Sequence, residues 1–440
     1  MSVRVRFAPS PTGNVHIGNI RAAIFNWLFA RNQNGKFLLR VEDTDLERST
    51  AAAIQTLLDV MQWLGLDYDE ETVYQSKLSN RHLEAAEMLL KAGAAYRDNS
   101  DGKGECIRFR MPKTGTLEFK DLVKGRLRKK GEDTQDFVIV RSDGSPVFHL
   151  ANVVDDMDMS ITHIIRGDDH VENTFKHIEI FKALGKEPPQ YAHLPMIVNN
   201  QGKPYSKRDG AAFVGEFKEQ GFLADALFNF LALLGWAPDD GREIFTRPDL
   251  IAAFSLDRCK ASAARFDIKK LTWMNGEYIR QLPHDIFAAE FENRARAQNV
   301  WPENFGKEKL DLLLAQIQPR TKLLSELPDN SLWFLTDNYP FSTQAVDKRL
   351  KVDGIPELLL EIAAIFENLT EFTVETTEQA LRSFSEQRGS SMGSLVHPIR
   401  VAISGVTEGP GLFDMLVLLG REKSCLRLRN VAEKLKNNQF

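Results

Sequence analysis

The first 41 residues constrain the fold of this chain more strongly than any other segment. Residues 3–8 alternate apolar side chains with arginines and predict a short β-strand, and apolar residues at helical spacing predict a helix over residues 17–31. Residues 36–41 predict a second strand, which completes a strand–helix–strand unit. Such a unit favours a parallel sheet, in which ligands bind beyond the carboxyl ends of the strands. The loop at residues 9–19 and Glu42 follow these two ends and are therefore candidate parts of a site.

The composition is that of an ordinary globular protein of roughly two to four domains. The 440 residues are 43% hydrophobic and 27% charged, which excludes a disordered chain, a collagen-like chain and a disulfide scaffold. The 56 Lys and Arg residues do not outnumber the 61 Asp and Glu residues, so a nucleic-acid site has to be a local basic patch. Cys106, Cys259 and Cys425 form no disulfide framework and no CxxC pair, which fits a reducing compartment. Neither a membrane span nor a signal peptide is evident, so we expect a cytoplasmic protein with no membrane partner.

The pattern of predicted elements changes along the rest of the chain. We expect helices over residues 51–64 and 81–92, strands of a separate smaller unit over 108–111, 116–121 and 136–141, and buried strands at 161–166 and 191–198 on either side of a helix at 172–184. From residue 222 the pattern is almost wholly helical, with a hinge at Pro283. The final 20 residues carry six Lys or Arg and two Glu, a net charge of +4, which predicts either an RNA-facing helix or a solvated helix face.

The loop at residues 9–19 has the features of an anion-binding site. The free N–H groups at the start of the following helix, and its dipole, favour negative charge. Gly18 has no side chain and lets a nucleotide approach the backbone, and His16 can donate a hydrogen bond to a phosphate. The alternative is that Gly18 is a packing glycine and His16 a helix cap. The preceding Pro-Ser-Pro-Thr-Gly at residues 9–13 favours the phosphate-binding interpretation.

A second short segment, Gly-Lys-Pro-Tyr-Ser-Lys-Arg-Asp-Gly at residues 202–210, is basic and follows a predicted strand. Cations on such a loop can neutralise charge that develops on transferring phosphates. Alone, the segment is typical of a surface turn with solvated lysines. Its occurrence together with the first loop favours a catalytic role.

Together the two segments resemble the HIGH and KMSKS signatures of class I aminoacyl-tRNA synthetases. The segments RFAPSPTG, HIGN, LLRVEDTD, FHLANVVDD, HIIRGDDH, HLPMIVN, SKRDGA and DIKKLTWMNGEYI are similar to bacterial glutamyl-tRNA synthetases, in the same order. This resemblance is specific from residue 3 to about residue 280. Residues 391–420 resemble the anticodon-binding end of the same family.

The resemblance implies an α/β fold with four regions. Residues 1–80 and 151–198 would form a Rossmann-like catalytic domain on a parallel sheet, and residues 81–150 an α+β insertion that binds the acceptor end of tRNA. Residues 199–283 would carry the KMSKS-type loop and a helical domain that contacts the tRNA stem, and residues 284–440 an all-helical anticodon-binding region. Within the insertion, residues 120–130 hold six basic residues and one acid, which suits a track for phosphates.

The reaction implied by the resemblance is the ATP-dependent attachment of L-glutamate to the 3′ end of tRNA(Glu). The α-carboxylate attacks the α-phosphate of ATP to give glutamyl-adenylate and diphosphate, and a ribose hydroxyl of tRNA then displaces AMP. No protein nucleophile is needed, so catalysis depends on positioning and on stabilisation of charge. Mg²⁺ is expected with ATP. Some relatives bind zinc through clustered cysteines, but the insertion here has only Cys106, so we expect no structural zinc and no protein metal site. A monomer is expected by analogy with the family.

The resemblance also assigns residues. His16, Gly18 and Lys207 are the expected catalytic residues, and ATP is expected to contact His16, Gly18, Asn19, Asp169, Ser206, Lys207 and Arg208. Asp169 matches an acid near the ribose or base, and Lys207 matches the lysine that stabilises the diphosphate leaving group. The first lysine of KMSKS is Pro204 here, with Lys203 as a neighbouring substitute.

The expected glutamate-binding residues are Arg6, Ala8, Ser10, Glu42, Phe148, Asn152 and Arg166. Arg6 and Arg166 would bind the two carboxylates, because guanidinium donates to carboxylate in a bidentate fork, while Ser10 and Glu42 face the ammonium group. The alternative is that these arginines pair structurally with Glu42 and Asp168. Phe148 stands where the family commonly has Tyr, which removes a hydroxyl from the expected pocket.

Several other functions stay open at this point. The same chemistry could charge tRNA(Gln) as well as tRNA(Glu). The helical residues after Pro283 argue against the truncated relative that glutamylates a modified tRNA nucleoside. A small-molecule nucleotidyltransferase is usually much shorter, and a non-catalytic RNA-binding descendant would not need His16, Gly18 and Lys207.

Overall fold

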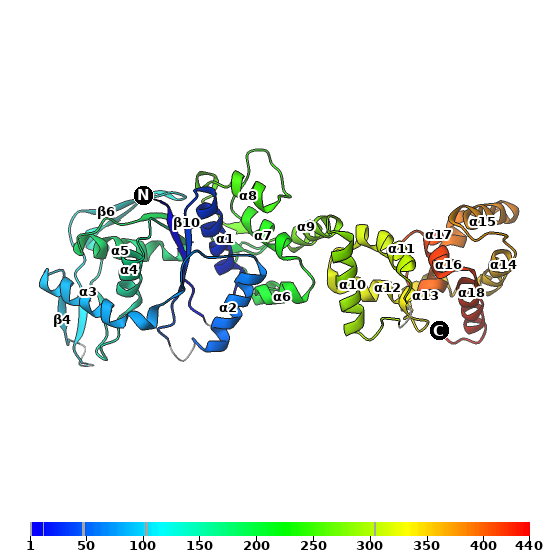
Figure 1. Ribbon diagram of the computed structural model, residues 1–440, viewed down its shortest axis with the longest axis horizontal. Helices are drawn as coiled ribbons and strands as arrows, with labels where there is room; N and C mark the ends of the chain where they lie inside the picture. Colours follow the sequence, from blue (N-terminus) through cyan, green and yellow to red (C-terminus); the bar gives the residue numbers. More distant parts are fainter. Residues whose placement is uncertain (1, 12, 46–48, 101, 103, 303–304) are drawn as a thin grey trace. The chain divides into compact units, whose positions relative to one another are not determined.

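The computed structural model describes residues 2–11, 13–45, 49–100, 102, 104–302 and 305–440. Thr12 of the first motif lies outside these described residues. The chain divides into two compact units, Met1–Met274 and Asn275–Phe440. Within the described residues, all strands belong to the first unit and the second unit is helical, as Figure 1 shows.

A parallel sheet forms the centre of the first unit, as expected. Strand β1 (Arg4–Phe7) pairs with β2 (Lys36–Val41), and β2 pairs with the short β3 (Val73–Tyr74). On the other side, the Thr162 N–H donates to the Arg4 carbonyl at 2.9 Å and places β9 (His163–Gly167) beside β1. Strand β10 (Gln190–Leu194) pairs with β9, also in parallel. The carboxyl ends of β1, β2, β9 and β10 therefore meet at one edge of the sheet.

Helices cover this sheet and bury its apolar side chains. Helix α1 (Ile17–Asn32), between β1 and β2, contacts β1, β2 and β9, and also α7 (Ala224–Leu233) and α8 (Arg247–Ala253). Helices α4 (Phe148–Asp158) and α5 (Val171–Ala183) contact each other (Figure 1). They share one hydrophobic cluster with the strands, which includes Leu38, Leu150, Val153, Ile164, Phe175, Ile178 and Tyr191.

Helix α4 was not predicted from the sequence. Its last turns contain Asp155, Asp156 and Asp158, and carboxylates near a helix C-terminus oppose the helix dipole. Asp155 and Asp156 are each 1% exposed, so this helix forms only where other elements provide cations for them. Arginines from β1 and β2 meet Asp156, as described below.

The smaller sheet between the halves of the main sheet is antiparallel. It follows α2 (Ala51–Trp63) and α3 (Ser79–Lys91) and has the order β4–β5–β8, with bounds Ala95–Asp98, Cys106–Phe109 and Phe137–Val140. The sequence placed residues 116–121 in this smaller unit, but β6 (Thr116–Asp121) instead pairs with β10 of the main sheet and with β7 (Gly125–Lys130). The reason is Asp121, whose carboxylate accepts the backbone N–H of His193 in β10 at 3.2 Å.

The predicted strand at 191–198 is also divided. After β10 the chain forms β11 (Ile197–Val198), which pairs with β12 (Ala264–Arg265) and not with the main sheet. Helices α6 (Val214–Glu219) and α9 (Ile268–Arg280) complete this part of the chain.

The second unit begins within α9 and continues from α10 to the C-terminal α18. Its helices are α10 (His284–Ala297), α11 (Lys307–Ile317), α12 (Leu327–Leu335), α13 (Thr343–Arg349), α14 (Ile355–Glu367), α15 (Val374–Arg388), α16 (Met392–Ser404), α17 (Leu412–Leu419) and α18 (Arg421–Lys436). None of the helices in the described residues is long and apolar enough to cross a membrane.

The basic C-terminal helix α18 is held by ion pairs within this unit. Lys423 pairs with Asp337 at 2.6 Å, Arg429 with Glu367 at 2.6 Å and Lys436 with Glu357 at 3.2 Å. Arg427 is 5% exposed, and it donates to the carbonyls of Ile403 and Thr336. Most of the positive charge that the sequence shows here therefore stabilises the helical unit itself.

Candidate active site

The start of helix α1 lies at the carboxyl end of β1. His16 is the N-cap of this helix, and its Nδ1 atom accepts the N–H of Gly18 at 3.1 Å. The capping role that the sequence offered as an alternative is therefore present. It does not prevent contact with a phosphate, because burial lowers the pKa of His16 and the neutral ring then carries its proton on Nε2. His16 can cap the helix and donate from Nε2 at the same time.

Gly18 leaves room for this cap. A Cβ atom at this position would lie 3.3 Å from Nδ1 of His16, closer than side chains normally approach. Its neighbour Asn19 is exposed and donates its backbone N–H to the His16 carbonyl at 3.0 Å. The N–H groups of Gly18 and Asn19 therefore both have acceptors on His16.

The basic loop after β11 is organised by one carboxylate. Asp209 accepts the N–H of Ser206 at 2.9 Å, its hydroxyl at 3.1 Å and the side chain of Asn199 at 2.7 Å. These bonds close a single helical turn, η4 (Lys207–Asp209). The side chains of Lys203, Pro204, Lys207 and Arg208 are exposed on this loop.

The structure brings the two motifs together. The Ile17 N–H donates to the Ala212 carbonyl at 3.0 Å, and the Val214 N–H donates to the Val15 carbonyl at 3.0 Å. Phe213 between them contacts the His16 ring edge-on, with ring centres 6.0 Å apart. The Lys207 Nζ atom lies 5.8 Å from the centre of the same Phe213 ring. His16, Gly18 and Lys207 therefore lie around one short backbone ladder, although Lys207 is nearly 200 residues away in the sequence.

A buried cluster of charges lies under the ends of β1 and β2. Arg6 donates to both oxygens of Asp156, at 3.0 and 3.2 Å, and Arg40 donates to Asp156 at 2.6 Å. Burial alone would raise the pKa of Asp156, but Arg40 and Arg6 hold it below its usual range. Arg40 also donates to Glu42 at 3.2 Å. The alternative expected from the sequence, a structural pair between Arg6 and Glu42, is wrong. Arg6 does form an ion pair, but its partner is Asp156.

Glu42 contacts the side-chain amide of Asn152, in which only the nitrogen has a hydrogen-bond partner among the described residues. The Asn152 Nδ2 atom donates to Glu42 at 2.9 Å, while the buried Asn152 Oδ1 atom has no hydrogen-bond partner in the described part of the chain. Burial raises the pKa of Glu42 despite the nearby Arg40 and Arg6. A ligand ammonium group would satisfy both the carboxylate and the free amide oxygen.

Arg166, at the end of β9, is held by neutral groups. Its Nη2 atom donates to the Thr174 hydroxyl at 2.7 Å, its Nε atom lies 3.4 Å from His193 Nε2, and its guanidinium lies 5.6 Å from the Tyr191 ring centre. Burial lowers its pKa to about 10, so it remains a cation at neutral pH. It has no carboxylate partner among the described residues, and the alternative pairing with Asp168 is wrong because Asp168 binds Lys124 at 2.7 Å.

The other expected residues differ in how far they are buried. Phe148 begins α4, and its ring lies 5.8 Å from the His170 ring and 5.6 Å from the His177 ring. Ala8 is half-buried and Ser10 is exposed after β1. Asp169 is exposed, 3.5 Å from His170 Nε2. Within the described ranges, no group of three or more His, Cys, Asp or Glu residues could hold a metal ion.

Sequence reasoning did not identify Arg40 and Asp156 as parts of this site. A signal was present for Arg40, which interrupts an apolar strand, whereas nothing in the sequence separates Asp156 from the neighbouring Asp155 and Asp158. A charge in a buried element requires a partner of opposite charge. Which acid meets which arginine depends on the packing of α4 on the sheet.

A family model for the catalytic domain of class I tRNA synthetases of the E and Q type matches residues 2–103 and 99–273. The chain belongs to this family. An anticodon binding domain model matches residues 286–432 of this class I tRNA synthetase.

Relatives of this synthetase match it over almost its full length. Glutamate--tRNA ligase 1 of Caldanaerobacter subterraneus subsp. tengcongensis is 38% identical over 474 residues, covering 99% of this chain and 98% of the relative. The Glutamate--tRNA ligase of Akkermansia muciniphila is 40% identical over 439 residues, covering 97% and 98%. The crystal structure of a glutamate tRNA ligase from Elizabethkingia meningosepticum, in complex with its amino acid, has a TM-score of 0.88 at 26% identity and covers 99% of this chain and 100% of that one.

Proposed function

We propose that this protein attaches L-glutamate to the 3′ end of tRNA(Glu) in two steps, through glutamyl-adenylate, with release of diphosphate and AMP. The observation that carries the proposal is Arg166, a buried cation with no carboxylate partner among the described residues, at the edge of the sheet where class I synthetases bind their substrates. A buried charge is costly unless a ligand neutralises it. A substrate with a second carboxylate meets this requirement, and the relatives are named glutamate--tRNA ligases.

We assign the glutamate carboxylates to Arg166 and Arg6. Arg6 already uses Nε and Nη2 on Asp156, which leaves Nη1 for a ligand. The ammonium group is assigned to Glu42, the free Asn152 oxygen and Ser10. Ala8 and Phe148 provide the remaining wall.

ATP is assigned to the surface formed by the two motifs. His16 Nε2 is placed to donate to phosphates, because Nδ1 is already occupied by the Gly18 N–H, and Gly18 and the exposed Asn19 lie beside it at the positive end of the α1 dipole. Lys207, with Ser206 and Arg208 beside it, stabilises the charge that develops on diphosphate as the α-phosphate is attacked. Asp169 is assigned to the ribose or base.

Mg²⁺ fits this arrangement as an ion that arrives with ATP. Mg²⁺ is usually held by substrate phosphates and waters with few protein ligands, and the described residues contain no dedicated cluster. When bound, the ion neutralises charge on the phosphates.

The domain assignments carry over to the proposal. Residues 1–80 and 151–198 form the catalytic domain, 81–150 bind the acceptor end, 199–283 carry the basic loop and contact the stem, and 284–440 bind the anticodon. The match of the anticodon model to residues 286–432 supports the last assignment. We further propose that the protein acts as a monomer in the cytoplasm, where a reducing environment suits its free Cys106, Cys259 and Cys425.

The test is aminoacylation of purified tRNA(Glu) and tRNA(Gln) with labelled glutamate, ATP and Mg²⁺. We expect charging of tRNA(Glu). Charging of tRNA(Gln) as well would identify an enzyme with relaxed tRNA choice. No charging of either tRNA by the folded protein would overturn the proposal and direct attention to Phe148 and Pro204.

A further inference from the structure

We propose that Asp121, His193 and Thr174 form a positioning chain that fixes the Arg166 guanidinium for glutamate binding. This inference rests on the proposed role of Arg166 in binding a glutamate carboxylate. None of the three residues is expected to touch the substrate. Their effect is transmitted through Arg166.

The chain begins at a fixed carboxylate. Asp121 is 1% exposed, and it accepts the backbone N–H groups of Val123 at 2.9 Å and Lys124 at 2.8 Å in the turn after β6. Its Oδ2 atom lies 2.6 Å from Nδ1 of His193, and its oxygens also accept the His193 backbone N–H at 3.2 Å. Asp121 therefore holds both the ring and the backbone of His193.

The contact to Asp121 decides which nitrogen of the His193 ring carries the proton. The carboxylate requires a donor at Nδ1, so the neutral ring presents Nε2 as an acceptor. Burial lowers the pKa of His193 although Asp121 opposes this, which keeps the ring neutral at physiological pH. Nε2 faces the Thr174 hydroxyl at 3.0 Å and the Arg166 Nε atom at 3.4 Å. A protonated ring would instead direct a donor and a positive charge at the guanidinium.

Thr174 completes the chain. Its hydroxyl is fully buried on α5 and accepts from Arg166 Nη2 at 2.7 Å. Its single proton can go to either of two acceptors, Nε2 of His193 at 3.0 Å or the His170 carbonyl at 3.1 Å. Thr174 and His193 together hold Nε and Nη2 of Arg166, while no hydrogen bond to Nη1 is present within the described residues. The Nη1 atom of Arg166 is therefore left to donate to a ligand.

The chemical type of these partners is the central point of the inference. A carboxylate next to Arg166 would fix it equally well, but would also neutralise the charge that attracts the substrate. A hydroxyl and a neutral imidazole fix the orientation and leave the positive charge uncompensated. Asp121 does not contact Arg166 and acts through the His193 ring that lies between them. Residues that orient the ligands of a metal act in the same indirect way.

The principal test is Thr174→Val, which removes the hydroxyl and keeps the shape of the side chain. We expect the KM for glutamate in aminoacylation to rise about tenfold, which corresponds to about 1.4 kcal/mol, with unchanged KM values for ATP and tRNA. The matched control is Thr377→Val, since Thr377 is also fully buried and donates to the carbonyl four residues before it, in the second unit. An unchanged glutamate KM in Thr174→Val would overturn the proposal.

A second pair of variants separates this chain from the role of Arg166. Arg166→Lys is expected to raise the glutamate KM strongly, and adding Thr174→Val to it is expected to change the KM less than twofold, because the positioned group is already gone. If Arg166→Lys leaves the KM unchanged, the proposed function of Arg166 fails. If Arg166→Lys acts but the two effects multiply, Thr174 does not act through Arg166 and the positioning chain is wrong.

His193 provides a further comparison. Glutamine can offer a side-chain oxygen to Arg166, whereas leucine cannot. We expect the glutamate KM to rise in His193→Leu and to rise less in His193→Gln. The two variants are compared at equal melting temperature. Equal KM values in these two variants would contradict the role of the Nε2 acceptor.

Discussion

At the residue scale, the site depends on which cations keep a free hydrogen-bond donor. Arg40 is fully buried and engages Asp156 and Glu42, so it serves the structure. Arg6 binds Asp156 through two nitrogens, and Arg166 binds only neutral groups. Lys207 is the opposite case, with a side chain that is 73% exposed and 3.8 Å from Glu216. Such a weak exposed pair costs little to break when phosphates arrive.

The first prediction concerns Lys207. Lys207→Ala is expected to lower kcat for aminoacylation about 100-fold with little change in the glutamate KM, because its contact to diphosphate strengthens in the transition state. Lys218→Ala, an exposed lysine on the neighbouring helix α6, serves as the control and should retain its kcat. A normal kcat in Lys207→Ala would exclude the role assigned to this lysine.

At the scale of the element, helix α4 shows how the site and the fold depend on each other. Its Asp156 binds arginines from both β1 and β2, and its Asn152 binds Glu42. The contacts that neutralise the buried Asp156 therefore also fix Arg6, and the neighbouring Asn152 fixes Glu42. This coupling explains why Asp156 is tolerated near the C-terminal end of the helix.

The second prediction follows from Asp156. Asp156→Ala leaves the buried Arg6 without its carboxylate partner and removes the shortest ion pair of Arg40, so it is expected to lower the free energy of unfolding by about 3–5 kcal/mol. Since the folded-state pKa of Asp156 is lowered, its contribution is fully present above the unfolded pKa of about 3.9 and is lost as pH falls through the folded value. Urea unfolding between pH 7 and pH 3 measures both effects.

The control for this variant is on the same helix. Asp158→Ala breaks an exposed pair with Arg81, whose side chains are 42% and 34% exposed, and should cost less than about 1 kcal/mol. Equal losses in the two variants would mean that the buried pairing of Asp156 is not what stabilises α4.

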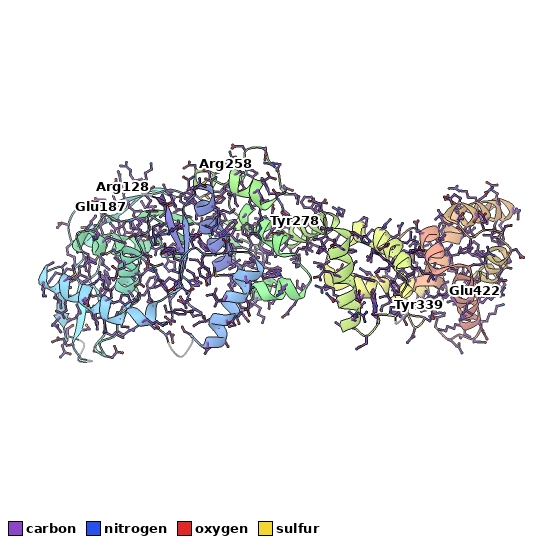
Figure 2. All side chains as sticks on the ribbon, in the orientation of Figure 1. Arg128, Glu187, Arg258, Tyr278, Tyr339 and Glu422 are labelled. Carbon is purple, nitrogen blue, oxygen red and sulfur yellow. The ribbon has the colours of Figure 1, made fainter. Side chains whose placement is uncertain are left out.

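The third prediction concerns the β6–β7 hairpin. Arg126 and Arg128 both pair with Glu118, yet their side chains remain 63% and 60% exposed, and Figure 2 shows Arg128 at the periphery of the first unit. Phosphates can therefore compete with Glu118 for both. The double variant Arg126→Gln, Arg128→Gln should raise the KM for tRNA and reduce the salt dependence of tRNA binding, with unchanged KM for ATP and glutamate. Lys182→Gln on α5 is the control, and an unaltered salt dependence in the double variant would argue against a phosphate track here.

At the scale of the whole molecule, the chain forms two units with separate cores. The first carries the sheet and both nucleotide motifs. The second is stabilised by its own contacts, including Arg427 against the Tyr339 ring at 4.2 Å and the Tyr339 hydroxyl on the Ala402 carbonyl at 2.6 Å. Figure 2 labels Tyr339 within this unit.

The fourth prediction uses this division. We expect calorimetric unfolding of the full chain to depart from a single two-state transition, since each unit has its own core. Asp156→Ala should lower the melting temperature of one transition only. A single transition that moves as a whole would show that the two units unfold together.

The sequence by itself determined the parallel sheet and the family, because these depend on local periodicity and on short segments with recognisable chemistry. The matches to both family models confirm the family, and the parallel pairs β1–β2 and β9–β10 confirm the sheet. Tertiary structure alone decided which acid meets which arginine and that β6 joins the main sheet. These features depend on contacts between residues far apart in the chain, and a buried charge can be placed only once its partner is known.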